Sequence, residues 1–242
     1  MMNLRYARQM GLPQIGMEGQ IRLKKAKAAV VGAGGLGSPA LYYLAAAGVG
    51  AIKIIDADSV DITNLNRQIL HFQGDLGKEK CRSAKEKLER FNAETTIETA
   101  VARLDESNAG VLLHGAGTVI SCVDNDETRR TLNAYCAATG TTLINGGVSG
   151  FEGYVMVVQP GRTPCFQCIF RAGGEKARAN AGSGGVLGAA AGVVGSMMAA
   201  EAIKSMLGLP AQPSFYYVDL LSAQIIPVSA ERDAACPACG RI

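Results

Sequence analysis

The most informative stretch of the sequence is Val30-Val31-Gly32-Ala33-Gly34-Gly35-Leu36-Gly37, which joins an apolar run to a glycine-rich turn. The apolar run, Lys27–Val31, has the length of a buried strand, and residues 36–47 have helical spacing. A GxGxxG pattern between a strand and a helix is the context in which this motif binds nucleotides. Glycines let phosphate groups approach the backbone, and the helix N-terminus favours their negative charge.

Two carboxylates, Asp56 and Asp58, follow the second apolar run, Ala51–Ile55. A carboxylate at the end of the second strand, about 20 residues beyond the glycine turn, can hold ribose hydroxyls. The glycine turn and these carboxylates predict a nucleotide site, but they fit NAD and ATP equally.

Three charged residues favour ATP over NAD. Arg67 lies in the polar run Asn64-Leu65-Asn66-Arg67-Gln68, Lys80 opens the next predicted helix, and Asp124 ends a later predicted strand. The carboxyl ends of the strands in a doubly wound sheet converge on one crevice. There a guanidinium and an ammonium can neutralise a triphosphate, and a carboxylate can hold Mg²⁺. NAD requires none of these groups, although Arg67 and Lys80 taken alone also fit a solvated surface.

Strands alternate with helices in the first half of the chain, which indicates a parallel sheet. Strands are expected at 27–31, 51–55, 95–101, 118–121 and 142–144, and helices at 36–47, 78–91 and 126–138. Strands at 153–159 and 214–226, with no crossover helix between neighbours, suggest an antiparallel extension. We expect a single domain over 1–242, with a Rossmann-like, doubly wound, mostly parallel α/β sheet. Residues 1–150 form its nucleotide-binding half.

Residues 181–200 contain no charged side chain and raise the question of a membrane span. Their many Gly and Ala residues make them weakly hydrophobic, and Glu201 and Lys204 follow directly, so a buried helix at 186–207 is expected. The preceding stretch, 172–185, is expected to be a mobile crossover loop.

The charge, the N-terminal sequence and the cysteines limit the partners and the compartment that can be expected. The 242 residues carry a formal net charge of +3, which is too small to argue for a nucleic-acid partner. The N-terminus lacks the apolar stretch of a signal peptide. Seven cysteines without a secretory signal favour a reducing cytoplasm. We therefore expect a cytoplasmic protein with no membrane association.

Two CxxC pairs, Cys165-Phe166-Gln167-Cys168 and Cys236-Pro237-Ala238-Cys239, lie far apart in the sequence. Two such pairs are a strong signal for a tetrahedral, closed, structural zinc site with four thiolate ligands. A redox role or unconnected thiols are the alternative. The other cysteines, Cys81, Cys122 and Cys136, are expected to be small buried hydrophobic residues.

Together these motifs resemble the MoeB/ThiF/HesA family, bacterial relatives of ubiquitin-activating enzymes. The resemblance runs over nearly the whole chain. It rests on the RYxRQ start at 5–9, the GxGGLG turn at 32–37, the Asp56–Asp58 pair, NLxRQ at 64–68, GxxK at 77–80, Asp124-Asn125, the helix containing Gly192 to Lys204, and both CxxC pairs.

The resemblance implies an adenylyltransferase that activates the C-terminal glycine of a ubiquitin-like sulfur carrier, with ATP, Mg²⁺ and Zn²⁺. It also implies a homodimer in which Arg8 reaches the neighbouring subunit's ATP site, and a carrier-binding and zinc-binding half at 151–242. Asp56 would hold the ribose, and Asn64, Arg67 and Lys80 would bind the phosphates. Asp124 would coordinate Mg²⁺ or sit beside the reacting groups. The full expected nucleotide set is Gly32, Gly34, Gly35, Gly37, Asp56, Asp58, Asn64, Arg67, Gln68, Lys80, Asp124 and Asn125. The expected catalytic residues are Arg8, Arg67 and Asp124.

The sequence departs from the family at the crossover loop, where many members carry a cysteine. Alignment through Gly192 places Ala181 there, and residues 171–185 contain no cysteine. A covalent enzyme–carrier link through this loop is therefore not expected. The sequence ends at Ile242, without the rhodanese domain of some relatives, so we expect a separate sulfur donor.

Other functions stay open at this point. An NAD-dependent oxidoreductase would explain the glycine turn and Asp56 but leaves Arg67, Lys80 and the CxxC pairs without roles. Adenylation of a peptide or of a tRNA base is a second alternative, and a non-catalytic dimeric scaffold is a third. The carrier is also open, since molybdopterin, thiamine, cysteine and tRNA-thiolation pathways use similar enzymes.

Overall fold

A computed structural model describes residues 4–170, 185–211 and 213–240. Its centre is an eight-stranded sheet with the order β3-β2-β1-β4-β5-β6-β7-β8. The first five strands are mutually parallel, and the last three extend the sheet antiparallel. The strands are β1 (Lys27–Val31), β2 (Ala51–Ile55), β3 (Thr96–Ala100), β4 (Thr118–Ser121), β5 (Thr142–Ser149), β6 (Glu152–Val158), β7 (Phe215–Asp219) and β8 (Gln224–Pro227). The predicted mixed sheet is confirmed.

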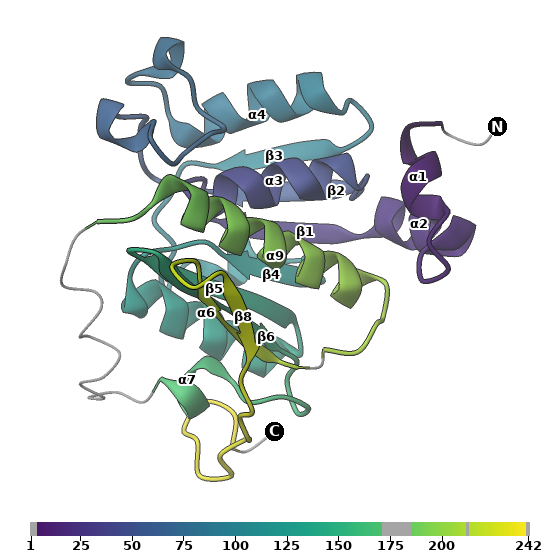
Figure 1. Ribbon diagram of the computed structural model, residues 1–242, viewed down its shortest axis with the longest axis vertical. Helices are drawn as coiled ribbons and strands as arrows, with labels where there is room; N and C mark the ends of the chain where they lie inside the picture. Colours follow the sequence, from purple (N-terminus) through teal and green to yellow (C-terminus); the bar gives the residue numbers. More distant parts are fainter. Residues whose placement is uncertain (1–3, 171–184, 212, 241–242) are drawn as a thin grey trace.

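Helices cover both faces of the sheet (Figure 1). One face carries α3 (Gly37–Ala46), α4 (Lys80–Phe91) and α9 (Gly188–Met206), and the other carries α5 (Ala109–Leu112), α6 (Asp126–Thr139) and α7 (Phe166–Ile169). Side chains alternate across a strand, so Val30 of β1 packs in the α3–α4–α9 core and Val31 packs in the opposite core. This two-faced burial explains why β1 is apolar from its second residue to its last.

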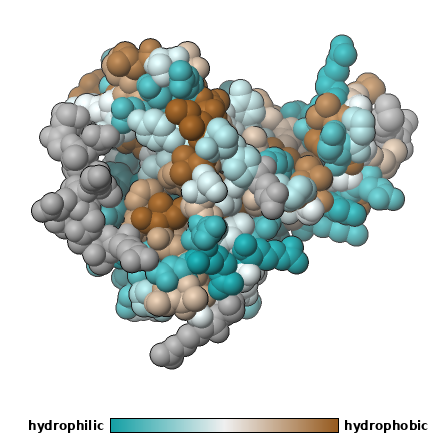
Figure 2. Space-filling model, turned by 60° about the horizontal axis from the view of Figure 1, so that its bottom comes forward, coloured by the Kyte–Doolittle hydropathy of each residue, from teal (hydrophilic) through white to brown (hydrophobic). Residues whose placement is uncertain are grey.

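The N-terminal helices, η1 (Leu4–Tyr6), α1 (Ala7–Met10) and α2 (Gly16–Lys25), project from the body of the molecule at the right of Figure 1 and of the turned view in Figure 2. They are attached to the end of α3, where Gln9 Nε2 donates to the carbonyl oxygen of Ala47 at 2.8 Å. Gly48, with φ +77°, leaves room for the Tyr6 ring, since a Cβ there would lie 2.6 Å from Tyr6 Cζ. The segment therefore sits at the opposite end of α3 from the glycine turn.

Helix α9 is 19 residues long and lies across the sheet against α3, β5 and β6. Val194, Met198 and Ala202 on its inner side are fully buried. The predicted buried helix is confirmed, and no helix in the described ranges is long and apolar enough to cross a bilayer. Of the predicted crossover loop at 172–185, all but Gly185 lies outside the described residues, and so does Ala181.

Two expected strand boundaries were wrong. Strand β5 continues to Ser149 rather than stopping at 144, because β6 pairs with it from Leu143 to Ser149 after a turn at Gly150. The expected strand 214–226 is instead a hairpin of β7 and β8. Asp219 shapes its turn, since Oδ1 accepts from the N–H of Leu221 at 2.9 Å and Oδ2 from Ser222 Oγ at 2.6 Å.

Candidate nucleotide and metal sites

The carboxyl ends of β1, β2 and β4 are level. Val31 pairs with Ile55 on one side and with Ser121 on the other, so the segments that follow these three strands start at one edge of the sheet. Here the strand order reverses between β1 and β4, the position at which ligands bind in such sheets. The predicted convergence of the glycine turn, Asp56 and the segment before Asp124 is therefore present.

The glycine turn depends on close backbone approach. Gly32 has φ +98°, and a Cβ there would lie 2.6 Å from the Cys122 carbonyl oxygen. A Cβ on Gly37 would lie 2.1 Å from the carbonyl oxygen of Gly32. Only glycine fits at these two positions, so the turn brings the start of α3 tightly against the ends of β1 and β4.

The turn leaves backbone donors available. In the described part of the chain, the N–H groups of Gly34, Gly35 and Leu36 donate no hydrogen bond, and no side chain caps α3. Free N–H groups at a helix N-terminus form an anion site, because the helix dipole adds positive potential there.

The two carboxylates after β2 have different roles in the fold. Asp56 accepts the N–H of Ala33 at Oδ2 (2.7 Å) and the N–H of Asp58 at Oδ1 (2.8 Å), so it fixes the glycine turn. Asp58 accepts from Lys80 Nζ at 2.8 Å. Lys80 is only 6% exposed, so its ammonium is held at this edge by a specific partner.

The polar run begins at the last residue of the 3-10 helix η2 (Ile62–Asn64) and continues as a turn through Arg67. The Oδ1 atom of Asn64 accepts the N–H of Asp61 at 3.2 Å. Arg67 Nη1 donates to the carbonyl oxygen of Thr63 (2.8 Å), and within the described residues the guanidinium has no carboxylate partner. The side chain of Arg67 flanks the glycine turn, since a Cβ on Gly35 would lie 3.5 Å from its Cγ.

Gln68 is brought to the same turn. It is 5% exposed, and a Cβ on Gly34 would lie 3.4 Å from its Nε2. Its Oε1 is buried without a hydrogen-bond partner among the described residues. A buried, unsatisfied amide beside a glycine turn is a group that a bound ligand or water can complete.

The predicted residues differ in whether they lie at this edge: Asp124 and Asn125 follow β4 there, whereas Arg8 does not. Asp124 is exposed after β4, and its carboxylate makes no contact with a polar side chain in the described ranges. Asn125 caps α6 by accepting the N–H of Thr128 at 2.9 Å. Arg8 is exposed on α1, at the far end of α3 from the glycine turn.

Arg129 is a buried residue beside the candidate site that no sequence motif indicated. It is 7% exposed, and it donates to Asn145 Oδ1 (2.9 Å), to Tyr154 Oη (2.7 Å) and to the carbonyl oxygen of Val123. It thereby holds the backbone beside Asp124. The available signal was its helical spacing, because it shares the inner side of α6 with Leu132.

The four predicted metal ligands form one cluster. Their sulfur atoms all lie within 4.8 Å of one another, with Cys165–Cys236, Cys165–Cys168 and Cys168–Cys239 separations of 3.6, 3.7 and 3.5 Å. Four sulfurs at about 2.3 Å from one Zn²⁺ would be about 3.8 Å apart in a tetrahedron. The donor set and its spacing therefore fit zinc, and the predicted tetra-cysteine metal site is confirmed.

The cluster is supported from α6. The buried Asn133 donates through Nδ2 to Cys165 Sγ (3.5 Å) and accepts the N–H of Phe166 at 2.9 Å. The N–H of Asp233 points to Cys168 Sγ at 3.5 Å. Such donors stabilise thiolate charge and orient the ligands.

The remaining cysteines, Cys81, Cys122 and Cys136, are buried. Burial raises the pKa of each thiol to about 12. They are therefore uncharged at neutral pH and pack as small apolar groups, as predicted.

Fold and site together define a nucleotide-binding α/β protein with a tetra-cysteine metal site. The chain matches the ThiF family over residues 6–238 and belongs to that family. This confirms the resemblance seen in the sequence.

Named relatives match most of the chain. The chain is 40% identical to the sulfur carrier protein adenylyltransferase of Thermus thermophilus, a match covering 98% of the chain and 90% of that protein. It is 39% identical to the molybdopterin-synthase adenylyltransferase of Salmonella typhimurium, covering 98% and 96%. The adenylyltransferase and sulfurtransferase MOCS3 of Anopheles gambiae is 43% identical over 84% of the chain, but the chain spans only 46% of that protein. The expected enzyme class, an adenylyltransferase, is the one these relatives' names carry.

Among solved structures, the crystal structure of E. coli MccB with ATP is similar to this chain with a TM-score of 0.84 at 25% identity. The match covers 98% of this chain and 75% of that one.

Proposed function

We propose that this protein is an ATP-dependent adenylyltransferase that activates the C-terminal glycine of a small ubiquitin-like sulfur carrier protein. The carrier's carboxylate attacks the α-phosphorus of ATP, a new O–P bond forms, and pyrophosphate leaves with the electrons of the broken P–O bond. The product is an acyl adenylate, which a sulfur donor then consumes.

The observation that carries this proposal is the position of the Arg67 side chain. It flanks the glycine turn, in which the N–H groups of residues 34–36 donate no hydrogen bond within the described ranges. Arg67 itself has no carboxylate partner among the described residues. Uncompensated positive charge over a helix N-terminus is suited to a triphosphate. A dinucleotide that serves only as a hydride carrier requires no such group, and MccB, the solved relative with ATP, supports the same choice of nucleotide.

The chemical difficulty is that two anions must meet. Arg67 and the anion site of the glycine turn would hold the phosphates. Lys80 would either move from Asp58 toward the phosphates or donate hydrogen bonds to Asp58 and the phosphates together. Fixed positive groups of this kind stabilise the charge that develops on phosphorus and on the leaving pyrophosphate. Asn64, Gln68 and Asp56 would orient the phosphates and the ribose.

Asp124 would hold the Mg²⁺ that accompanies ATP. Its carboxylate is exposed and unpaired within the described ranges, and carboxylate oxygen is a ligand that Mg²⁺ prefers. When bound, Mg²⁺ neutralises phosphate charge. Arg129 holds the carbonyl of Val123 and would keep Asp124 in place.

The tetra-cysteine site would hold a structural Zn²⁺. The four thiolates leave no open position for a substrate, so the metal would link Cys165 and Cys168 to the distant Cys236 and Cys239 without taking part in adenylation. Ligand cysteines must be reduced to bind zinc, and we therefore include a reducing compartment, the cytoplasm, in the proposal.

We further propose a homodimer in which Arg8 completes the neighbouring subunit's site. Arg8 lies on a segment attached at the far end of α3 from its own glycine turn. An apolar groove of about 570 Å³, lined by residues that include Tyr42, Tyr43, Ile69 and Met197, runs between α3 and α9. Tyr43 and Ile69 are 56% and 57% exposed, which supports a subunit contact on this face.

The carrier would dock on the antiparallel half. The edge strand β8 exposes Ile225 and Ile226, and Leu221 in the preceding turn is 79% exposed. The sulfur donor would be a separate protein, and the pathway would be of the molybdopterin or thiamine type.

The test is exchange of labelled pyrophosphate into ATP by the purified protein, measured with each small carrier ending in Gly-Gly. We expect exchange only when a carrier is present, and none with a carrier that lacks its last glycine. Absence of exchange with every carrier, together with a change in nicotinamide fluorescence on mixing with NADH, would replace this proposal by an oxidoreductase.

A further inference from the structure

The backbone of Ala33, inside the glycine turn, is held from two sides. Its N–H donates to Asp56 Oδ2 at 2.7 Å, and its carbonyl oxygen lies 2.8 Å from His71 Nε2. His71 is 4% exposed, and its other ring nitrogen, Nδ1, lies 2.8 Å from Ser83 Oγ. Each ring nitrogen of this buried histidine therefore forms a hydrogen bond, one with Ala33 and one with Ser83.

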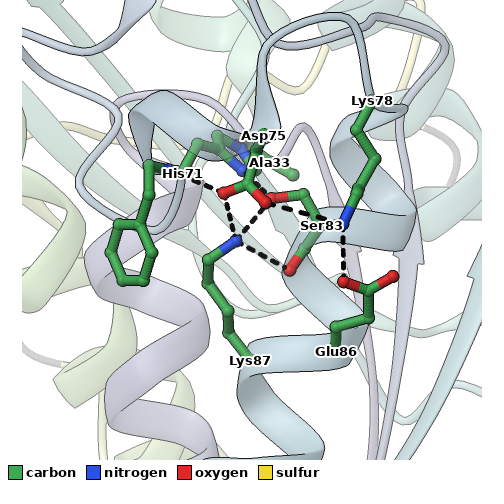
Figure 3. A network of polar contacts seen from close by, with 8 residues as sticks. Ala33, His71, Asp75, Lys78, Ser83, Glu86 and Lys87 are labelled. Atoms are coloured by element: carbon green, nitrogen blue, oxygen red, sulfur yellow. Dashed lines mark hydrogen bonds and ion pairs between the residues drawn. The ribbon is translucent and has the colours of Figure 1, made fainter.

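The partners fix the direction of each hydrogen bond. A carbonyl oxygen can only accept, so Nε2 of His71 carries the hydrogen. In the neutral ring Nδ1 then accepts from the Ser83 hydroxyl. Ser83 Oγ in turn accepts from Lys87 Nζ at 2.8 Å, and Lys87 is also paired with Asp75 (Figure 3). The chain of donors runs from Lys87 to the glycine turn.

This chain joins the three segments that carry the candidate nucleotide residues. His71 follows the polar run, and its N–H donates to the carbonyl oxygen of Gln68 at 3.0 Å. Ser83 and Lys87 are on α4, whose first residue is Lys80. Ala33 belongs to the glycine turn itself. A change at His71 therefore affects the relative placement of all three segments.

We propose that His71 is a positioning residue of the nucleotide site, whose Nε2–H holds the Ala33 carbonyl and so keeps the following N–H groups of the glycine turn oriented for phosphate. His71 acts through the backbone of Ala33 rather than by touching the nucleotide. The inference rests on the proposed ATP site.

The surroundings keep the ring neutral and in one tautomer. The charged groups around it are Lys80 and Lys87 of α4 and Asp75 of η3 (Gln73–Asp75), and the glycine turn contributes none. Burial is the largest cause that lowers the pKa of His71, and the two lysines add to it. A neutral imidazole with Nε2–H matches the acceptor at Ala33.

The experiment compares ATP binding by two variants. His71→Gln keeps an amide N–H near the position of Nε2, whereas His71→Asn is too short to reach the Ala33 carbonyl. We expect His71→Asn to weaken ATP binding, measured by calorimetry without carrier, by about tenfold, the effect of losing one buried hydrogen bond. We expect His71→Gln to recover most of that loss, and KM for the carrier to stay unchanged in both.

The exposed His114→Asn is the matched control and should bind ATP like the wild type. Folded His71→Asn that binds ATP with wild-type affinity would overturn the inference while leaving the ATP site intact, and so would a His71→Gln variant no better than His71→Asn. If neither variant folds, Ser83→Ala decides, with a loss of about threefold expected and unchanged affinity contradicting the proposal. Wild-type protein that binds no ATP would overturn the proposed function as well.

Discussion

Arg67 and Asp124 differ from Lys80 in the state of their charges. Lys80 is buried and paired with Asp58, so its positive charge is balanced by that carboxylate in the absence of a ligand. The charges of Arg67 and Asp124 have no ionic partner in the described part of the chain. Both groups lie at the same edge of the sheet. A bound ligand or metal ion would supply the opposite charge that each of them lacks.

We therefore expect Arg67→Ala and Asp124→Ala to lower pyrophosphate exchange by about 100-fold or more, because each removes charge stabilisation at the reacting phosphates. Their thermal stability should stay within a few degrees of the wild type. Arg90→Ala, an exposed arginine at the end of α4, is the control and should keep full exchange. Wild-type exchange in either test variant would refute its place in the site.

His71 should also affect how the free energy of unfolding varies with pH. Its pKa in the folded protein is lowered from 6.5, chiefly by burial, so the unfolded chain binds its proton more readily than the folded one. The stabilisation is then fully present above pH 6.5 and is lost as the pH falls through the lowered pKa. Denaturant unfolding at several pH values measures the free energy of unfolding. As the pH is lowered, this free energy should fall less for His71→Gln than for the wild type. His114→Gln should follow the wild-type curve.

Some residue-scale features followed from the sequence and others could not. The glycines and Asp56 have roles set by their neighbours in the chain, so motif and spacing located them. The roles of His71 and Arg129 depend on burial against segments far away in sequence, at Ala33 and Tyr154. A lone histidine or a helical arginine carries no sign of such a partner.

At the scale of elements, α7 carries the first pair of metal ligands, since Cys165 is its N-cap and Cys168 lies within it. It has only four residues, which is too few for a stable isolated helix. Asn133 of α6 and the four sulfur ligands hold it in place. The antiparallel end of the molecule therefore depends on the cluster more than the parallel half does.

Metal analysis should find one Zn²⁺ per chain, and its removal by a chelator should lower Tm by more than about 10 °C. Structural zinc contributes on the order of 10 kcal/mol, and each kcal/mol shifts Tm by about 2–4 °C at this size. Cys239→Ser should behave like the chelated protein. Cys136→Ala, outside the cluster, should still bind zinc, and a metal-free wild type of full stability would rule out the structural role.

Element boundaries were predictable where the pattern was local. Strands β1, β2 and β4 and helix α6 lie where the sequence indicated, because their apolar segments are bounded by turns. The hairpin of β7 and β8 was not foreseen, since its turn depends on Asp219 bonding to Leu221 and Ser222. The continuation of β5 to Ser149 depends on a partner strand that follows it.

At the scale of the whole molecule, the N-terminal helices and the glycine turn lie at opposite ends of α3 (Figure 1). Arg8 is exposed there and has no polar partner among the described residues. In a shared site, Arg8 comes from one subunit and Arg67 from the other. A dimer of one Arg8 variant and one Arg67 variant therefore keeps one site with both arginines.

Arg8→Ala and Arg67→Ala should each be almost inactive alone, and mixing them under conditions of subunit exchange should restore about a quarter of wild-type exchange through heterodimers with one intact site. Sedimentation should show a dimer. Arg90→Ala mixed with Arg67→Ala is the control, and it should give about half of wild-type exchange whether or not the subunits exchange. Mixtures that form heterodimers yet stay inactive would contradict a shared site.

The ligands of the metal cluster leave the ribosome at different times. Cys165 and Cys236 are 71 residues apart, so at ordinary rates of synthesis the second ligand pair emerges about 4–14 s after the first. During that interval the nascent chain holds two thiols without their metal partners, while six of the eight strands have been made. Its yield in a cell should therefore depend on how well it is shielded from oxidants while it is being made, long before any substrate is present.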